Sequence, residues 1–200
     1  MLNDLISLVE TGKFIDSGRM DLSEARWIGK DLALCFYVSP DGKTQEVWEV
    51  ICKSVVESQL TETTNCGLNY WESEDHPVIA QYSEPHEDLY FSKPTENPSA
   101  LLGILWKVHR KATDNWIPFD RYINRQVTPR ELFESDMGML ASGPSYLIEA
   151  YASAIDNEGM KPRRLASEEG IYVPEAKMIH FSESYVVAET FEASRIRDHK

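Results

Sequence analysis

Apolar and polar residues repeat with a helical period at the start of the chain. The apolar positions of this segment are Leu2, Leu5, Ile6 and Val9, and Gly12 follows them. A spacing of three and four residues places such side chains on one face of a helix, and glycine commonly ends a helix. The pattern therefore predicts an amphipathic helix over residues 3–11. Asp21, with Glu24 three residues later, predicts a second, short helical turn.

From residue 31 onward the pattern changes to that of strands. The runs rich in strand-forming residues cover 32–38, 44–52, 55–63 and 77–91, and the turn residues Pro40, Asp41 and Gly42 separate the first two. Runs of this length, bounded by proline, glycine and asparagine, are typical of strands joined by tight turns. Together they predict a meandering antiparallel sheet over about residues 31–92.

Helical patterns then replace the strands. The predicted helix starts are Asn97-Pro98, Thr128-Pro129 and Gly143-Pro144. Asparagine or threonine before proline is typical of a helix N-terminus, and Glu131 forms a capping box with Thr128. Gly159 is the expected end of the last of these helices. The helices therefore cover about residues 98–156, and strand-like runs return over 171–193.

The order of these elements indicates the fold class. Strands are followed by helices and then by strands again, without alternation of single strands and helices, so the pattern predicts an α+β fold rather than a doubly wound sheet. The mainly antiparallel sheet comes from strands of about 31–92 and 171–193, and it packs against helices of about 98–156. The length of 200 residues fits one domain, so we expect a single α+β domain over residues 1–200. Residues 161–164 and the tail after about residue 194 are expected to be flexible.

Composition places the chain among ordinary globular proteins, with 42% hydrophobic and 26% charged residues. No apolar run is long enough to cross a bilayer. Near the N-terminus, acidic residues occupy the region in which a secretory signal peptide would carry basic residues, so a signal peptide is not expected. Three cysteines are too few for a secreted disulfide framework. With a turn at 40–42, Cys35 and Cys52 are also not cross-strand partners. We therefore expect a soluble, cytoplasmic protein that does not bind membranes.

Acidic side chains are concentrated in the first half of the chain. The formal net charge is −13. Residues 1–105 carry 7 basic and 18 acidic side chains, whereas residues 106–200 carry 13 and 15. Between Lys53 and Lys93 there is no basic residue, but there are eight acids. Binding of nucleic acid requires cations to neutralise phosphates, so this charge argues against a nucleic-acid partner.

The acidic segment also carries aromatic residues, and together they predict a surface for a basic partner protein. The candidate partner-binding residues are Glu72, Glu74, Asp75, Glu84, Glu87, Asp88, Trp71 and Tyr82. Complementary charge steers association, and aromatic side chains anchor interfaces. Residues 107–130 carry six basic and two acidic side chains, so the two regions can also pair within one molecule or across a homodimer. A charged sheet face that only keeps the protein soluble is the simpler explanation.

Two histidines in the same segment predict an alternative, a metal site. Its candidate ligands are His76, His86, Glu84 and Asp88. Imidazole and carboxylate groups are the ligands of zinc, iron and manganese in proteins. Along a strand, Glu84, His86 and Asp88 would point to one side. A solvated polar strand face explains the same residues without a metal.

Signatures of the common enzyme classes are absent from the sequence, which has no phosphate loop, dinucleotide fingerprint, G-x-S-x-G, H-E-x-x-H or C-x-x-C motif. We therefore predict no catalytic residue and no cofactor. The sequence favours a non-enzymatic, acidic interaction protein that binds a basic protein surface, inhibitor-like or antitoxin-like at most. The alternative is an enzyme or small-ligand-binding protein with a His/carboxylate site between the sheet and the helices.

Overall fold

The protein is described by a computed structural model, which contains two compact units. The first unit joins residues 1–73 to residues 175–200, and the second comprises residues 74–174. The described residues are 2–10, 19–40, 42–61, 68–71, 76–93, 95–128, 131–132, 135–168 and 170–196. Each unit is described by itself below, and the single domain over residues 1–200 stays a prediction. The structure confirms the α+β class, because helices accompany two antiparallel sheets.

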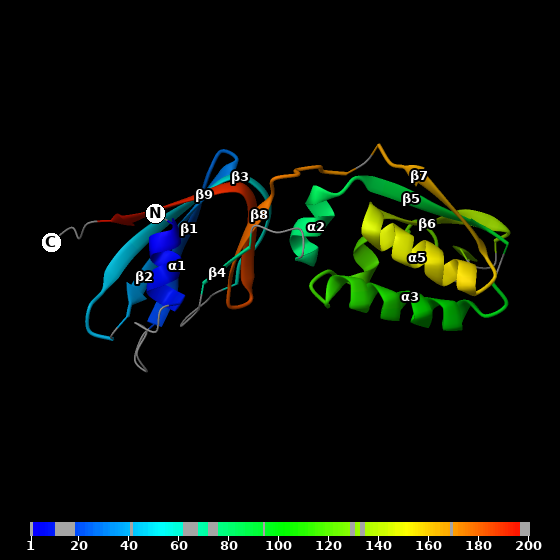
Figure 1. Ribbon diagram of the computed structural model, residues 1–200, viewed down its shortest axis with the longest axis horizontal. Helices are drawn as coiled ribbons and strands as arrows, with labels where there is room; N and C mark the ends of the chain where they lie inside the picture. The colour runs from blue at the N-terminus through cyan, green and yellow to red at the C-terminus, as the bar shows by residue number, and fades with distance from the viewer. Residues whose placement is uncertain are drawn as a thin grey trace. The chain divides into compact units, whose positions relative to one another are not determined.

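Unit 1 is built on a six-stranded sheet with strand order β1-β2-β3-β9-β8-β4 (Figure 1). The elements of this unit are α1 (Leu2–Glu10), β1 (Arg19–Ile28), β2 (Asp31–Ser39), β3 (Glu46–Gln59), β4 (Asn69–Trp71), β8 (Lys177–Phe181) and β9 (Ser184–Ile196). All neighbouring strands pair antiparallel. Strand β9 continues to residue 196, and the predicted flexible tail beyond it lies outside the described residues.

Alternation of side chains in β2 explains the core of unit 1. Leu32, Leu34 and Phe36 are completely buried, while Tyr37 is 42% exposed on the other face. The ring of Phe36 meets that of Phe181 edge to face, with centroids 5.2 Å apart. The side chains of Leu2 and Leu5 from α1 join the same cluster, as expected for the amphipathic helix predicted there.

The helical turn predicted from Asp21 and Glu24 is wrong, because both residues belong to strand β1. Pairing with β2 gives the backbone of β1 its hydrogen-bond partners and buries Met20, which a solvent-exposed turn would leave uncovered. Asp21 instead forms an ion pair with Arg19, with 2.7 Å between Oδ2 and Nε. Tertiary pairing therefore overrides the local capping pattern.

The register of β2 against β3 keeps two cysteines apart, as predicted. Cys35 lies opposite Glu49, and Cys52 lies opposite Leu32. Both are free thiols. Burial raises the pKa of the Cys52 thiol far above its ordinary value, and the nearby Asp31 carboxylate adds to this effect. A buried, protonated thiol of this kind acts as a small hydrophobic side chain.

Unit 2 is built on a three-stranded sheet with strand order β6-β5-β7, and α3 and α5 cover one of its faces (Figure 1). The elements are α2 (Pro77–Ser83), β5 (His86–Ser92), α3 (Pro98–Thr113), the 3-10 helix η1 (Phe119–Arg121), β6 (Met137–Pro144), α5 (Ser145–Asn157) and β7 (Lys161–Ala166). Leu89 and Phe91 of β5 are buried against the helices, in one cluster with Leu105, Leu147 and Ile155. None of the described helices is both long and apolar enough to span a bilayer.

Two of the predicted helix-start signals are present in unit 2. The Oδ1 atom of Asn97 accepts a hydrogen bond of 3.0 Å from the Ala100 amide, and Pro98 occupies the first turn, as predicted. The predicted capping box is also present, since the Thr128 amide donates to the Glu131 carboxylate and the Glu131 amide donates to the Thr128 hydroxyl. The Thr128 hydroxyl also donates to the Glu131 carboxylate at 2.7 Å, and this bond, together with the one from the Thr128 amide, lowers the pKa of the Glu131 carboxyl. Residues 129–130, where the helix was predicted to begin, lie outside the described residues.

Three local predictions in unit 2 are wrong. Residues 77–83 form helix α2 rather than a strand, because His76 caps the helix and Pro77 fits its first turn. Residues 137–144 form strand β6, although they lie within the predicted helical region of about 98–156. Residues 161–164 were expected to be flexible but belong to β7. Both strands gain their backbone partners from β5, which is distant in sequence.

Candidate functional site

The face of the unit 2 sheet that lies opposite α3 and α5 is the candidate site. Residues opposed across antiparallel strands point to the same face, so the pairing register defines this surface. One row across the sheet is Met139, Tyr90 and Arg163, the next is Met137, Ser92 and Lys161, and a third is Ser142, Asp88 and Leu165. We call the side chains of Tyr90, Met137, Met139, Lys161, Arg163 and Leu165 the open face.

A bulge between β5 and β6 shapes the open face. The register passes from Leu89 opposite Ala141 to Tyr90 opposite Met139, so Leu140 has no direct partner on β5. Leu140 and Ala141 are both completely buried on the helix side. Because the bulge adds one residue, Met139 points to the open face, where it pairs with Tyr90.

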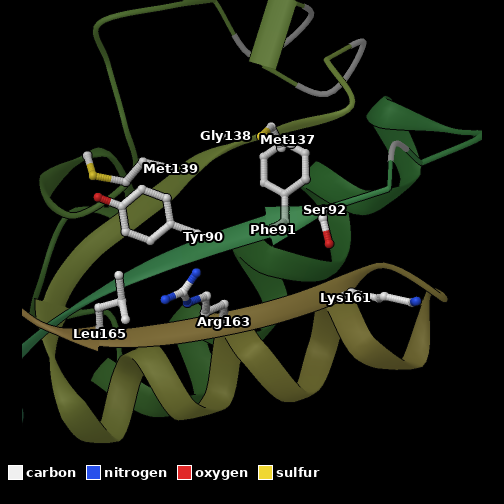
Figure 2. A pocket seen from close by; sticks show the side chains of 9 residues that line it. All are labelled: Tyr90, Phe91, Ser92, Met137, Gly138, Met139, Lys161, Arg163 and Leu165. Atoms are coloured by element: carbon white, nitrogen blue, oxygen red, sulfur yellow. The ribbon is translucent and has the colours of Figure 1, made fainter.

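Residues of the open face line a hollow of about 500 Å³. Figure 2 shows Tyr90, Met139 and Leu165 gathered on one side of the three strands, with Arg163 beside them. The side chains of Met137 and Leu165 are 71% and 40% exposed. Binding sites for ligands commonly measure roughly 300–1,000 Å³ and have mainly apolar walls with a few polar groups, so this hollow has the ordinary properties of such a site.

The two charged residues that line the hollow are both basic. Lys161 and Arg163 are its charged lining residues, and Tyr90 and Ser92 contribute hydroxyl groups. Asp88 lies on the same sheet face, one row away. The site therefore combines an apolar centre with a cationic side along β7.

Strand β7 ends the unit 2 sheet on one side, but its edge is poorly suited to pairing with another strand. Pro162 lies within β7 and has no backbone N–H. Proline in an edge strand removes a donor from the ladder and protects against the addition of further strands. Addition of a further strand at the β7 edge is therefore disfavoured.

Two of the partner-binding residues predicted from the acidic segment, Tyr82 and Glu84, make contacts inside unit 2. Tyr82 is buried in α2, with 6% of its surface exposed. The Glu84 carboxylate accepts hydrogen bonds of 2.5 Å from the Ser145 hydroxyl and 2.8 Å from the Tyr146 amide. Because these are the first residues of α5, Glu84 stabilises the N-terminus of that helix. Its position indicates a structural role.

Glu87 also has a partner within unit 2. Its carboxylate forms a bidentate ion pair with Arg164, with 2.5 Å from Oε2 to Nε and 3.1 Å from Oε1 to Nη2. Asp88, by contrast, is half-buried on the open side of the sheet. Glu72, Glu74 and Asp75 lie outside the described residues, as does the side chain of Trp71. An acidic surface for a basic partner stays a prediction.

The predicted metal ligands have separate contacts. The Nδ1 atom of His76 accepts a hydrogen bond of 3.2 Å from the Val78 amide, and the ring packs on Trp116. The Nε2 atom of His86 lies 3.0 Å from the Gln81 carbonyl oxygen. Over the described part of the chain, no three His, Cys, Asp or Glu side chains form a group that could hold a metal ion. The structure therefore does not bring His76, His86, Glu84 and Asp88 together as a metal site.

Behind the sheet, His109 joins three parts of unit 2. Its Nε2 atom lies 2.6 Å from the Ile117 carbonyl oxygen, and its Nδ1 atom lies 2.7 Å from the Tyr151 hydroxyl. Since the carbonyl accepts only, Nε2 carries the proton and Nδ1 accepts from tyrosine. Burial lowers the pKa of His109, and the hydrogen bond to Ile117 opposes part of that effect. The neutral imidazole thus connects α3, α5 and the segment after α3.

These contacts predict a loss of stability in weak acid. Because folding lowers the pKa of His109, the unfolded chain takes up a proton more readily, and the stabilisation present above about pH 6.5 decreases as the pH falls below it. His180 in unit 1 acts in the same direction, since burial lowers its pKa too. For His109 the free energy of unfolding should fall by at most about 1.4 kcal/mol per pH unit. Urea unfolding at pH 7 and pH 5.5 measures this.

The matched variant for this measurement is His109→Gln, which has no ionisable group at this position. Its free energy of unfolding should change less between pH 7 and pH 5.5 than that of the unaltered protein. An equal change in both proteins would contradict the assignment to His109.

Sequence reasoning missed Met139, Arg163 and Leu165, the residues that surround Tyr90. The signal was alternation with period two in β7, where Lys161, Arg163 and Leu165 share one face. Comparison of the chain with protein-family models, with curated proteins and with solved structures finds no match. The function is therefore argued from the residues of the site.

Proposed function

We propose that the protein is a non-enzymatic interaction protein that binds its partner on the open face of unit 2. One observation carries this proposal: Tyr90, Met139 and Leu165 form a contiguous apolar surface on the face of a sheet whose other face is covered by helices. Exposed apolar clusters rimmed by polar residues are typical of binding surfaces. Tyrosine is enriched among the residues that dominate binding energy, and methionine adapts its shape to a partner.

The contacts of unit 2 give less support to an enzyme. His76 and Glu84 each contact the N-terminus of a helix, and the Nε2 atom of His86 faces a backbone carbonyl. A general acid or base needs to reach a bound substrate, and a nucleophile needs a base beside it. The surface of Tyr90, Met139 and Leu165 requires neither, since contact alone supplies its binding energy.

An affinity experiment with the full chain tests this function. The tagged protein and its Met139→Asp variant are used as bait in an extract of the native organism, and recovered proteins are quantified by mass spectrometry. A carboxylate in the apolar centre should reduce recovery of the partner at least about tenfold, since unpaired charge in an interface costs several kcal/mol.

The matched control is Ser153→Asp, which adds the same charge at an exposed position of α5. This variant should recover as much partner as the unaltered protein. Equal recovery by all three baits, or no protein enriched by any of them, would contradict binding at the open face.

A further inference from the structure

The positive charges of the open face come from alternate residues of β7. Lys161 and Arg163 lie opposite Ser92 and Tyr90, and both are exposed. Arg164, between Arg163 and Leu165, points to the helix side, where Glu87 and Glu149 neutralise it. Across the described residues, no carboxylate forms an ion pair with Lys161 or Arg163. The two cations are therefore available to a partner.

Apolar side chains lie beside these cations on the open face, and Asp88 lies one row away from Arg163. Tyr90, Met139 and Leu165 lie in the same rows or in the next row of the sheet. A hydrated anion such as free phosphate can form only ionic contacts with the two basic residues. A peptide with both acidic and apolar side chains can form these ionic contacts and also apolar contacts with the hollow. The combination favours a ligand with acidic and apolar groups close together.

The charge of the whole protein adds to this selectivity. The chain has a net charge of −13, so a positive surface is a local exception on an acidic protein. An acidic partner is attracted to this face, as it is to the basic segment 107–130, and is repelled from the acidic parts of the chain. Nucleic acid needs many phosphate contacts for useful affinity, and two cations are few for that purpose.

From these observations we infer that the open face binds an acidic segment of a partner protein in which apolar side chains accompany aspartate or glutamate. This inference rests on the proposed function and specifies the class of partner. Arg163 and Lys161 pair with the carboxylates, and the hollow of about 500 Å³ receives the apolar side chains. The sign of the partner charge is opposite to the one predicted from the acidic segment of the sequence.

Three fluorescein-labelled synthetic peptides of equal length test this inference with the full chain. The first alternates glutamate and aspartate with leucine and phenylalanine, the second replaces every acid with lysine, and the third keeps the acids and replaces the apolar residues with serine. Fluorescence anisotropy should show that the first peptide binds at least about tenfold more tightly than the other two. Tighter or equal binding of the lysine peptide would overturn the inference.

Matched charge variants locate the site. The double variant Lys161→Gln, Arg163→Gln should weaken binding of the first peptide about tenfold or more. The double variant Lys107→Gln, Lys111→Gln removes two exposed bases from α3 and should leave binding unchanged. Equal losses in both double variants would mean that only net charge matters, and this would overturn the inference.

Further outcomes separate the inference from the proposed function. If the lysine peptide binds and Tyr90→Ala abolishes that binding, the open face is a docking surface for another class of partner, and only the inference fails. If no peptide responds to Tyr90→Ala and the affinity experiment also finds no partner, both fail. Sedimentation of the protein alone completes the test, since a dimer broken by Met139→Asp would assign the face to a second copy and overturn the inference.

Discussion

Replacing Leu89 with alanine is expected to lower the free energy of unfolding by about 3 kcal/mol, because a buried leucine truncated to alanine costs roughly 2–5 kcal/mol. Leu89 is completely buried in the cluster of unit 2. The same replacement at the next residue, Tyr90, should cost about 1 kcal/mol or less, since its side chain contributes mainly cross-strand contacts on the open face. Leu89 is therefore expected to stabilise the fold, whereas its neighbour Tyr90 is expected to contribute little to stability.

Urea unfolding followed by circular dichroism and tryptophan fluorescence measures both variants. If both variants have the same slope of free energy against urea concentration as the unaltered protein, neither changes the surface that is exposed on unfolding. A loss at Tyr90 as large as the loss at Leu89 would contradict the binding role of Tyr90. It would mean that Tyr90 supports the fold, and the open face would lose its central residue.

Tyr90→Ala is expected to weaken binding of the partner strongly, in contrast to its small effect on stability. Tyr90 lies in the middle strand of the sheet, between Met139 and Arg163. Central aromatic residues of interfaces commonly cost 2 kcal/mol or more when truncated, which corresponds to a loss of affinity of roughly 30-fold or more. The acidic and apolar peptide described above, measured by anisotropy, provides the affinity.

The control for this variant is Tyr90→Phe, which keeps the ring and removes the hydroxyl. It should retain affinity within about fivefold, because the ring supplies most of the contact area. If Tyr90→Ala binds as tightly as the unaltered protein, the apolar centre does not contribute to binding.

The sequence predicted those parts of the fold that depend on local pattern. Runs of strand-forming residues on either side of turn residues predicted β2 and β3, and the starts Asn97-Pro98 and Gly143-Pro144 predicted α3 and α5. Each of these signals lies within or next to the element that it predicts. The α+β class follows from them, and the structure confirms it.

Two strands that the sequence did not predict depend on a partner that is far away in the chain. Strands β6 and β7 become strands by pairing with β5, and the charged sequence of β7 contains a proline that suggested a flexible segment. Helix α2 is short and is capped by a histidine side chain, which is not among the usual capping residues. No window of local sequence contains the pairing of β6 and β7 with β5.

The candidate site was missed for the same reason. Tyr90 belongs to the acidic and aromatic segment that the sequence indicated, but its neighbours Met139 and Leu165 come from the two strands that were not predicted. The bulge places Met139 rather than Leu140 opposite Tyr90, and a sequence pattern does not show a shift in register. The acids Glu84 and Glu87 drew attention through their charge, whereas their contacts stabilise unit 2.

Photo-crosslinking from defined positions tests binding at the open face most directly. A benzoylphenylalanine residue is placed in the full chain at position 137, at position 165, or at position 107 on α3 as the control, and each protein is irradiated in cells of the native organism. Binding at the open face predicts that one and the same protein is crosslinked from positions 137 and 165 and not from position 107. Equal crosslinking from all three positions, or none from positions 137 and 165, would contradict it.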